Sequence, residues 1–127
     1  AEKLPFNNDQ FDYYTISFGI RNITNINNAL EEAFRVLKPG GRILCLEFSK
    51  VKNEILNRFY NIYSKSIPII GKLVVGNSEP YKYLVNSIKE FSSQEELLEL
   101  LKINNFSNVS FRNLSGGIVA IHSAWKI

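Results

Sequence analysis

The order of apolar and polar positions in the first half of the chain predicts a strand, a helix and a second strand. Residues 11–16 are rich in aromatic and β-branched side chains and predict a short buried strand that ends at Ser17. Across residues 26–37, apolar side chains recur at the spacing of one helix face. Residues 43–46 are apolar without alternation, which is typical of a strand covered on both faces. This order predicts a right-handed crossover between two parallel strands.

Polar residues and glycines mark the ends of this first helix. Thr24 or Asn25 is expected to cap its beginning, because a short polar side chain there can accept a bond from a free backbone N–H. Lys38 suits the negative end of the helix dipole, and the segment 39–41, Pro-Gly-Gly, is expected to stop the helix.

The middle of the chain is less regular. Apolar spacing predicts a second helix around residues 55–63. The stretch that follows it, up to Pro80, is apolar but interrupted by glycine and proline, which is more typical of a lid or an insertion than of a core element. Residues 81–88 are consistent with a short helix.

The last third predicts a helix and a β-hairpin. Ser93 and Glu96 form a capping box in front of a leucine-rich helix face. Residues 108–114 alternate apolar and polar side chains, and two glycines then turn the chain into the apolar run 118–121. A parallel unit followed by an antiparallel hairpin is therefore expected.

Composition narrows the classes of protein. With 127 residues, 45% of them hydrophobic and 21% charged, the chain is expected to form one globular domain. The net charge is +3, but the basic residues are scattered among acids, so no nucleic-acid partner is expected. No apolar run approaches the roughly 20 residues of a membrane span, and no targeting peptide is recognisable.

Cysteine and histidine are too few for a zinc site built from nitrogen and sulfur ligands, or for a convincing Cys-His pair. Cys45 and His122 are the single residues of their types, so neither an internal disulfide nor a four-ligand zinc site is expected, and both are interpreted as strand residues. A reducing cytosol or organelle matrix fits this composition. The chain has no methionine and starts at Ala1, from which we expect a fragment of a longer protein.

The most informative segment lies where the first strand ends. There the sequence Ser-Phe-Gly-Ile-Arg-Asn occupies positions 17–22, at the carboxyl end of a predicted parallel strand, which is where open α/β sheets bind ligands. Leu-Lys-Pro-Gly-Gly follows at 37–41, and Leu-Glu-Phe-Ser-Lys at 46–50. Together these motifs closely resemble the ubiquinone/menaquinone biosynthesis C-methyltransferase family, along essentially the whole chain.

The resemblance implies a fold and a reaction. The fold class is α/β, the second half of a class I S-adenosylmethionine-dependent methyltransferase (Rossmann-like) sheet that ends in an antiparallel β-hairpin. Residues 1–127 would be the C-terminal part of a single methyltransferase domain, whose glycine-rich cofactor-binding half is absent. The family uses S-adenosylmethionine to methylate a ring carbon of polyprenylated benzoquinols and naphthoquinols, and the isolated chain is expected to be inactive.

The resemblance also implies roles for individual residues. Arg21 is the catalytic candidate, because its planar and permanently charged fork suits a phenolate oxygen; the alternative is an ion pair between Arg21 and Glu47. Ala1 and Ser17 are expected to contact the cofactor, and Ser17 otherwise simply terminates the strand. Two further side chains, those of Asn22 and Tyr81, are expected near the acceptor.

Not every residue fits the family pattern. Tyr83, like Tyr81, resembles a residue of the family's segment near the acceptor pocket; the alternative, an ordinary half-buried aromatic residue, is favoured for Tyr83. Gly76, Asn77 and Pro80 depart from the residues that the family commonly has at these positions, which puts the substrate contacts of the segment in doubt.

A polyprenylated quinol implies a membrane-associated partner. The expected partners are this substrate and a homo-oligomer or a quinone-biosynthesis complex, and the expected location is the cytoplasm or an organelle matrix, peripheral to the inner membrane. Residues 67–75, flanked by lysines, are the expected membrane contact.

Two other classes remain open from the sequence. One is half of a nicotinamide-dependent oxidoreductase, because crossover units are shared between folds, although no dinucleotide fingerprint is present. The other is a non-catalytic folded remnant or partner-bound module.

Overall fold

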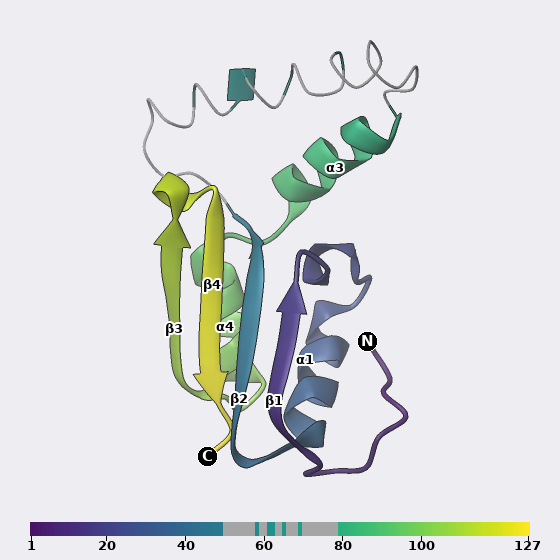
Figure 1. The fold of residues 1–127 in the computed structure, drawn as a ribbon, viewed down its shortest axis with the longest axis vertical. Coiled ribbons are helices and arrows are strands. Elements are labelled where there is room, and N and C mark those ends of the chain that lie inside the picture. The colour runs from purple at the N-terminus through teal and green to yellow at the C-terminus, as the bar shows by residue number, and fades with distance from the viewer. Residues whose placement is uncertain (50–57, 59–60, 63–64, 66–68, 70–78) are drawn as a thin grey trace.

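The structure is a computed structural model that describes residues 1–49, 58, 61–62, 65, 69 and 79–127. Its centre is a four-stranded sheet in the order β1-β2-β4-β3 (Figure 1). The strands are β1 (Phe11–Ser17), β2 (Leu37–Phe48), β3 (Ser107–Leu114) and β4 (Val119–Trp125). The helices are η1 (Ile20–Asn22), α1 (Ile26–Val36), α3 (Glu79–Glu90), α4 (Gln94–Ile103) and η2 (Ser115–Gly117).

The predicted crossover is confirmed, because β1 and β2 pair in parallel and α1 connects them. Asn25 caps α1, and its side-chain oxygen accepts a 3.1 Å bond from the backbone N–H of Asn28. The buried face of α1 carries alanine, leucine and valine at the predicted helical spacing. This face packs on the sheet, which fixes α1 beside β1 and β2.

The Pro-Gly-Gly segment does more than stop α1. The helix ends at Val36, and Leu37, expected as its last apolar position, is the first residue of β2. Leu37 pairs with Phe11 and Arg42 pairs with Tyr13, a step of five positions on β2 against two on β1, so β2 bulges between these pairs. A Cβ on Gly41 would lie 2.8 Å from the Lys38 carbonyl oxygen, so a side chain does not fit there without a shift.

The C-terminal half forms the predicted helix and hairpin. Ser93 caps α4: its hydroxyl accepts from the backbone N–H of Glu96 at 3.3 Å and donates to the Glu96 carboxylate at 3.1 Å, so the two residues of the predicted capping box are paired. β3 and β4 pair antiparallel, and β4 inserts between β2 and β3, with His122 opposite Cys45. The short helix expected at 81–88 is longer and spans all of α3.

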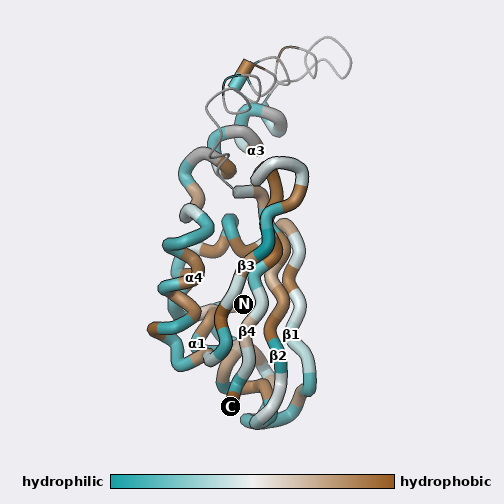
Figure 2. Tube along the Cα trace, turned by 90° about the vertical axis from the view of Figure 1, so that its left-hand side faces the viewer, coloured by the Kyte–Doolittle hydropathy of each residue, from teal (hydrophilic) through white to brown (hydrophobic). Residues whose placement is uncertain are grey.

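Helices cover one face of the sheet. Figure 2 shows α1 and α4 on the same side of the four strands. The core between these layers contains Ile20, Leu30, Ala33, Leu37, Ile43, Cys45, Phe91, Leu97, Leu101, Phe106 and Ala124. The apolar run in β2 predicts cover on both faces, but burial alternates along this strand and, in the described part of the chain, no helix covers the second face. The sheet therefore keeps one half-exposed face, on which leucines 44 and 46 lie.

No described helix is both long enough and apolar enough to cross a membrane.

Candidate active site

The candidate site begins where β1 ends. Ser17, at the last position of β1, is exposed. Phe18 follows with φ of 54°, a left-handed conformation that is unusual for a bulky residue, and its N–H donates to the Leu46 carbonyl at 2.8 Å. The chain then turns through Gly19 into η1, which carries Arg21 over the carboxyl ends of β1 and β2.

Arg21 is held on three sides. Its Nη1 donates to Oε1 of Glu47 at 2.8 Å and to the Phe18 carbonyl oxygen at 2.6 Å, and its Nε donates to the Ser87 hydroxyl at 3.3 Å. The guanidinium carbon lies 5.5 Å from the centre of the Phe48 ring. The arginine side chain is only 9% exposed. The ion pair that the sequence allowed as the alternative interpretation of Arg21 is therefore present.

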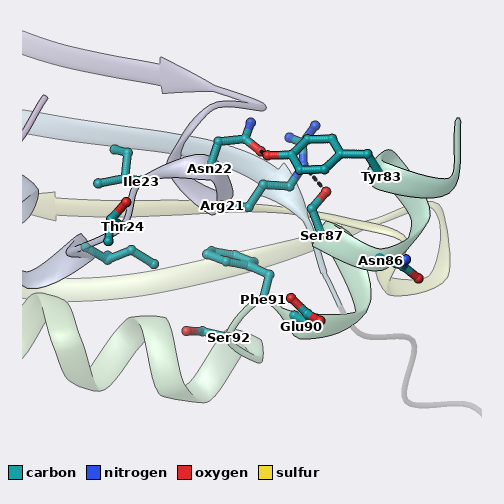
Figure 3. A pocket seen from close by; sticks show the side chains of 11 residues that line it. Arg21, Asn22, Ile23, Thr24, Tyr83, Asn86, Ser87, Glu90, Phe91 and Ser92 are labelled. Carbon is teal, nitrogen blue, oxygen red and sulfur yellow. Dashed lines mark hydrogen bonds between the residues drawn. The ribbon is translucent and has the colours of Figure 1, made fainter. Parts of the chain in front are cut away.

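A cavity of about 390 Å³ separates η1 from α3 (Figure 3). It is lined by Arg21, Asn22, Ile23, Thr24, Ile26, Tyr83, Asn86, Ser87, Glu90, Phe91 and Ser92. Hydroxyl, amide and charged groups from both elements therefore share one space with isoleucine and phenylalanine side chains. Such a mixture is typical of a pocket that binds and orients a small ligand.

Asn22 lines this cavity, and its hydrogen-bond partner is Tyr83. The Tyr83 hydroxyl donates to Oδ1 of Asn22 at 2.8 Å, across 61 residues of sequence. The interpretation of Tyr83 as an ordinary half-buried aromatic is wrong, because its side chain is 61% exposed and lines the cavity. Tyr81 belongs to α3, and its side chain lies outside the described residues.

The other α3 residues at the cavity were not predicted from the sequence. Asn86, Ser87 and Glu90 follow Tyr83 at the three- and four-residue spacings of one helix face, so helical periodicity could have grouped them. Which element this polar face meets depends on the tertiary structure.

The N-terminal segment runs along α1 and brings Ala1 toward the same end of the sheet. Oε1 of Glu2 accepts a 2.9 Å bond from the N–H of Asn25, the residue that caps α1. Further along, Glu32 accepts from the N–H of Leu4 at 2.8 Å. The bond from Arg35 lowers the pKa of the Glu32 carboxyl to about 2. Ala1 is exposed, and the bond between its neighbour Glu2 and Asn25 keeps it close to the beginning of α1. Three residues lie between the end of η1 and this helix.

Cys45 and His122 lie in strands, as the sequence predicts, and neither lines this cavity. Burial raises the pKa of the Cys45 thiol to about 12. Burial also lowers the pKa of His122, whose Nε2 donates to the Gln94 carbonyl at 2.9 Å. Both groups therefore favour their neutral forms. Within the described residues, histidine, cysteine and carboxylate side chains form no group that could hold a metal ion.

The fold, a mixed α/β sheet with a polar cavity at the carboxyl ends of its parallel strands, matches the structures of S-adenosylmethionine-dependent methyltransferases. The chain is similar to the crystal structure of a SAM-dependent methyltransferase from Thermotoga maritima, described as a possible histamine N-methyltransferase, with a TM-score of 0.68 and 20% identity. That match covers 99% of this chain and 60% of the other. A SAM-dependent methyltransferase from Aquifex aeolicus matches with a TM-score of 0.63 and 16% identity, covering 99% of this chain and 51% of the other.

Sequence similarity identifies the family. Residues 1–126 match the ubiE/COQ5 methyltransferase family, so the chain belongs to it. It is 60% identical to the ubiquinone/menaquinone biosynthesis C-methyltransferase UbiE of Rickettsia felis, and all of this chain matches 52% of that protein. It is 55% identical to the mitochondrial 2-methoxy-6-polyprenyl-1,4-benzoquinol methylase of Bos taurus, of which it covers 39%. The chain thus spans about half or less of these relatives' length, and the oxidoreductase alternative is wrong.

Proposed function

We propose that this chain supplies the acceptor side of an S-adenosylmethionine-dependent enzyme that methylates a ring carbon of a polyprenylated benzoquinol or naphthoquinol, in ubiquinone or menaquinone biosynthesis. The supporting observation is Arg21, whose side chain is largely shielded from solvent and lines a polar cavity beside Asn22 and Tyr83 at the carboxyl end of β1. Family membership and the activities in the names of the two relatives support the same reaction.

The residues expected to contact the cofactor are exposed and can offer polar groups to it. S-adenosylmethionine supplies an electrophilic methyl group when it is bound. Ser17 is exposed at the end of β1, where its hydroxyl can hydrogen-bond a polar ligand, and the Glu2 carboxylate next to Ala1 accepts from the N–H of Asn25 at the beginning of α1. We propose that these two segments hold the cofactor.

Arg21 is the proposed electrostatic catalyst. Loss of a quinol hydroxyl proton to water increases the electron density on the adjacent ring carbon, which attacks the methyl group while the methyl–sulfur bond breaks; the ring carbon then loses its own proton to water. A guanidinium near the oxygen stabilises the phenolate and the phenolate-like transition state relative to the neutral quinol. Asn22 and Tyr83 present an amide and a hydroxyl that can orient the ring, and we propose Tyr81 as a further acceptor contact from the same helix.

A polyprenyl tail places the substrate in a bilayer, so we propose a peripheral contact with the inner membrane from the cytoplasm or organelle matrix. Residues 67–75, the proposed contact, lie outside the described residues apart from Ile69. Assembly as a homo-oligomer or within a quinone-biosynthesis complex is proposed on the same basis.

Methylation of a defined acceptor tests this function. The full-length protein is incubated with S-adenosylmethionine carrying a deuterated methyl group and with a short-chain analogue of 2-methoxy-6-polyprenyl-1,4-benzoquinol. We expect mass spectrometry and NMR of the product to place the label on a ring carbon. Label on an oxygen, or no labelled product from the folded protein, contradicts the proposal.

A further inference from the structure

Glu47 is a buried carboxylate at the edge of the candidate site. It is the penultimate residue of β2 and is 2% exposed. Its Oε1 accepts from Nη1 of Arg21 at 2.8 Å and from the N–H of Phe48 at 2.9 Å, and its Oε2 accepts from the N–H of Arg21 at 3.3 Å. One carboxylate therefore binds both the main chain and the side chain of Arg21.

These contacts leave one end of the guanidinium available. Nη1 has two protons, and Glu47 and the Phe18 carbonyl accept them, while the Ser87 hydroxyl accepts the proton of Nε. Ser87 is fixed in turn, because its hydroxyl donates to the Leu84 carbonyl at 2.9 Å. Among the described residues, Nη2 has no hydrogen-bond partner. The arginine is thus oriented through one half of its fork, and its other half is available to a ligand.

The backbone around Phe18 is shaped to complete this arrangement. The left-handed conformation of Phe18 is a backbone outlier, and such strain persists only where surrounding structure enforces it. It allows the N–H to bond Leu46 on β2 while the carbonyl accepts from Arg21. The Phe18 ring packs against Phe48, with ring centres 4.8 Å apart, which holds the turn in place.

Stability alone is a weak reason for a buried carboxylate here. Removing two charges from water costs free energy that their attraction often only offsets, and apolar replacements of a buried pair are often neutral or stabilising. The ion pair between Asp9 and Lys126 has a comparably short distance, 2.6 Å, but its aspartate is 52% exposed and it lies away from the cavity. It is therefore a matched control.

We propose that Glu47 is the positioning residue for Arg21, which it orients so that Nη2 faces the oxygen of the bound acceptor. This role rests on the proposed function of Arg21. Glu47 has no contact with the ligand in this proposal and acts through the guanidinium alone. It follows that Glu47 matters for turnover only while Arg21 is present.

A double-mutant cycle in the full-length protein tests this dependence. Glu47→Gln keeps the shape of the side chain and loses its charge. We expect it to lower single-turnover methylation of the short-chain benzoquinol analogue by about 10- to 100-fold, as for a lost bond to a charged group. In an Arg21→Ala background the same change is expected to cost less than about twofold, because the residue being oriented is gone. The affinity for S-adenosylmethionine should differ by less than about twofold among all these variants, because in our proposal neither Arg21 nor Glu47 contacts the cofactor.

The control and the contradicting outcomes separate the hypotheses. Asp9→Asn should lower Tm without changing turnover, so a loss of turnover through general destabilisation would appear there as well. Equal losses from Glu47→Gln in both backgrounds overturn the positioning role but leave Arg21 catalytic. Normal turnover in Arg21→Ala instead overturns the role of Arg21 itself, and absence of a C-methylated product from the unmodified protein overturns the proposed function.

A direct measurement covers the case in which a variant folds poorly. In the full-length protein labelled with nitrogen-15 arginine, the Arg21 Nε and Nη1 protons should exchange slowly with water. Glu47→Gln should speed exchange at Nη1 by about tenfold or more, the factor for losing one bond to a charged group. Unchanged exchange at Nη1 means that Glu47 does not hold the guanidinium, and the proposal fails.

Discussion

The hydroxyl of Tyr83 donates a 2.8 Å hydrogen bond to Oδ1 of Asn22, which joins α3 to η1 across the mouth of the cavity. Tyr83 is 61% exposed, so this bond forms in contact with water. Its strength is therefore modest, and an acceptor that bonds either group can replace it. The bond therefore links α3 to η1 without holding the two elements rigidly together.

We expect Tyr83→Phe to affect acceptor binding more than stability. Loss of one neutral hydrogen bond costs about 0.5 to 1.5 kcal/mol, which corresponds to a rise of roughly two- to tenfold in acceptor KM. S-adenosylmethionine affinity should not change, because in our proposal Tyr83 contacts the acceptor and not the cofactor. Tyr13→Phe is the matched control, since Tyr13 is 66% exposed and lies at the other end of β1. An unchanged acceptor KM for Tyr83→Phe would remove Tyr83 from the acceptor site.

Substitution of Arg21 should separate charge from geometry. Removing one preorganised donor typically lowers turnover about 10²- to 10³-fold, and we expect this loss for Arg21→Ala. Arg21→Lys should recover only part of it, because lysine keeps the charge without the planar fork. Turnover per folded molecule, from single-turnover rates and thermal melts, checks this prediction.

Arg21→Ala should also be strongly destabilising, by about 3 to 5 kcal/mol, since Glu47 is left as an unpaired buried charge. If Arg21 only forms an ion pair, melting temperature falls while turnover per folded molecule stays normal. This outcome would end the catalytic assignment.

His122 predicts a pH dependence of stability. Burial lowers its pKa from the ordinary value of 6.5, so the unfolded chain binds the proton at a higher pH than the folded chain does. The stability that the neutral ring contributes is therefore present above about pH 6.5 and is lost as the pH falls toward the folded pKa. His122→Phe should flatten the dependence of Tm on pH from about 7 to 5.

His122 is the single histidine of this chain, so no other histidine of the chain contributes to the change of Tm between pH 7 and 5. The Glu32 carboxyl, whose pKa is lowered to about 2, contributes stability above its usual pKa and loses it only at more acidic pH. An unchanged slope in His122→Phe would show that another group carries the effect.

Cys45 should be unreactive in the folded protein. Burial, and then the nearby Glu47, raise its thiol pKa to about 12, so at pH 8 only roughly one molecule in 10⁴ carries a thiolate. An unfolded thiol has a pKa near 8.5 and is about one quarter ionised at pH 8. We therefore expect a thiol reagent to label Cys45 only after the protein unfolds. Ser110→Cys, in a Cys45→Ala background, provides an exposed control on β3. Native Cys45 reacting as fast as this control would contradict the prediction.

Local sequence signals determined the elements around the site. Helical spacing and the Asn25 cap predict α1, the Ser93 capping box predicts α4, and the glycine pair predicts the terminal hairpin. These features depend on residues within a few positions of each other, so they can be predicted without tertiary structure. The motif at 17–22 likewise placed the candidate site at the end of β1.

The two glycines after α1 show a feature of the fold that local sequence signals do not predict. Gly40 and Gly41 predict the end of α1, but their role in β2 depends on the opposing strand. A Cβ on Gly41 would lie 3.1 Å from the carbonyl oxygen of Asp12, a residue of β1 that sequence spacing does not bring close. The bulge is thus a consequence of strand pairing.

The sequence by itself determined the family, the strand-helix-strand unit and the location of Arg21 and Asn22 just beyond β1. Only the tertiary structure decided what these two residues contact. Arg21 meets Glu47 because parallel pairing of β1 and β2 brings their carboxyl ends together, and it meets Ser87 because α3 packs its polar face over η1. Sequence periodicity fixes which side chains share a helix face, but strand register and helix packing decide which distant groups that face contacts.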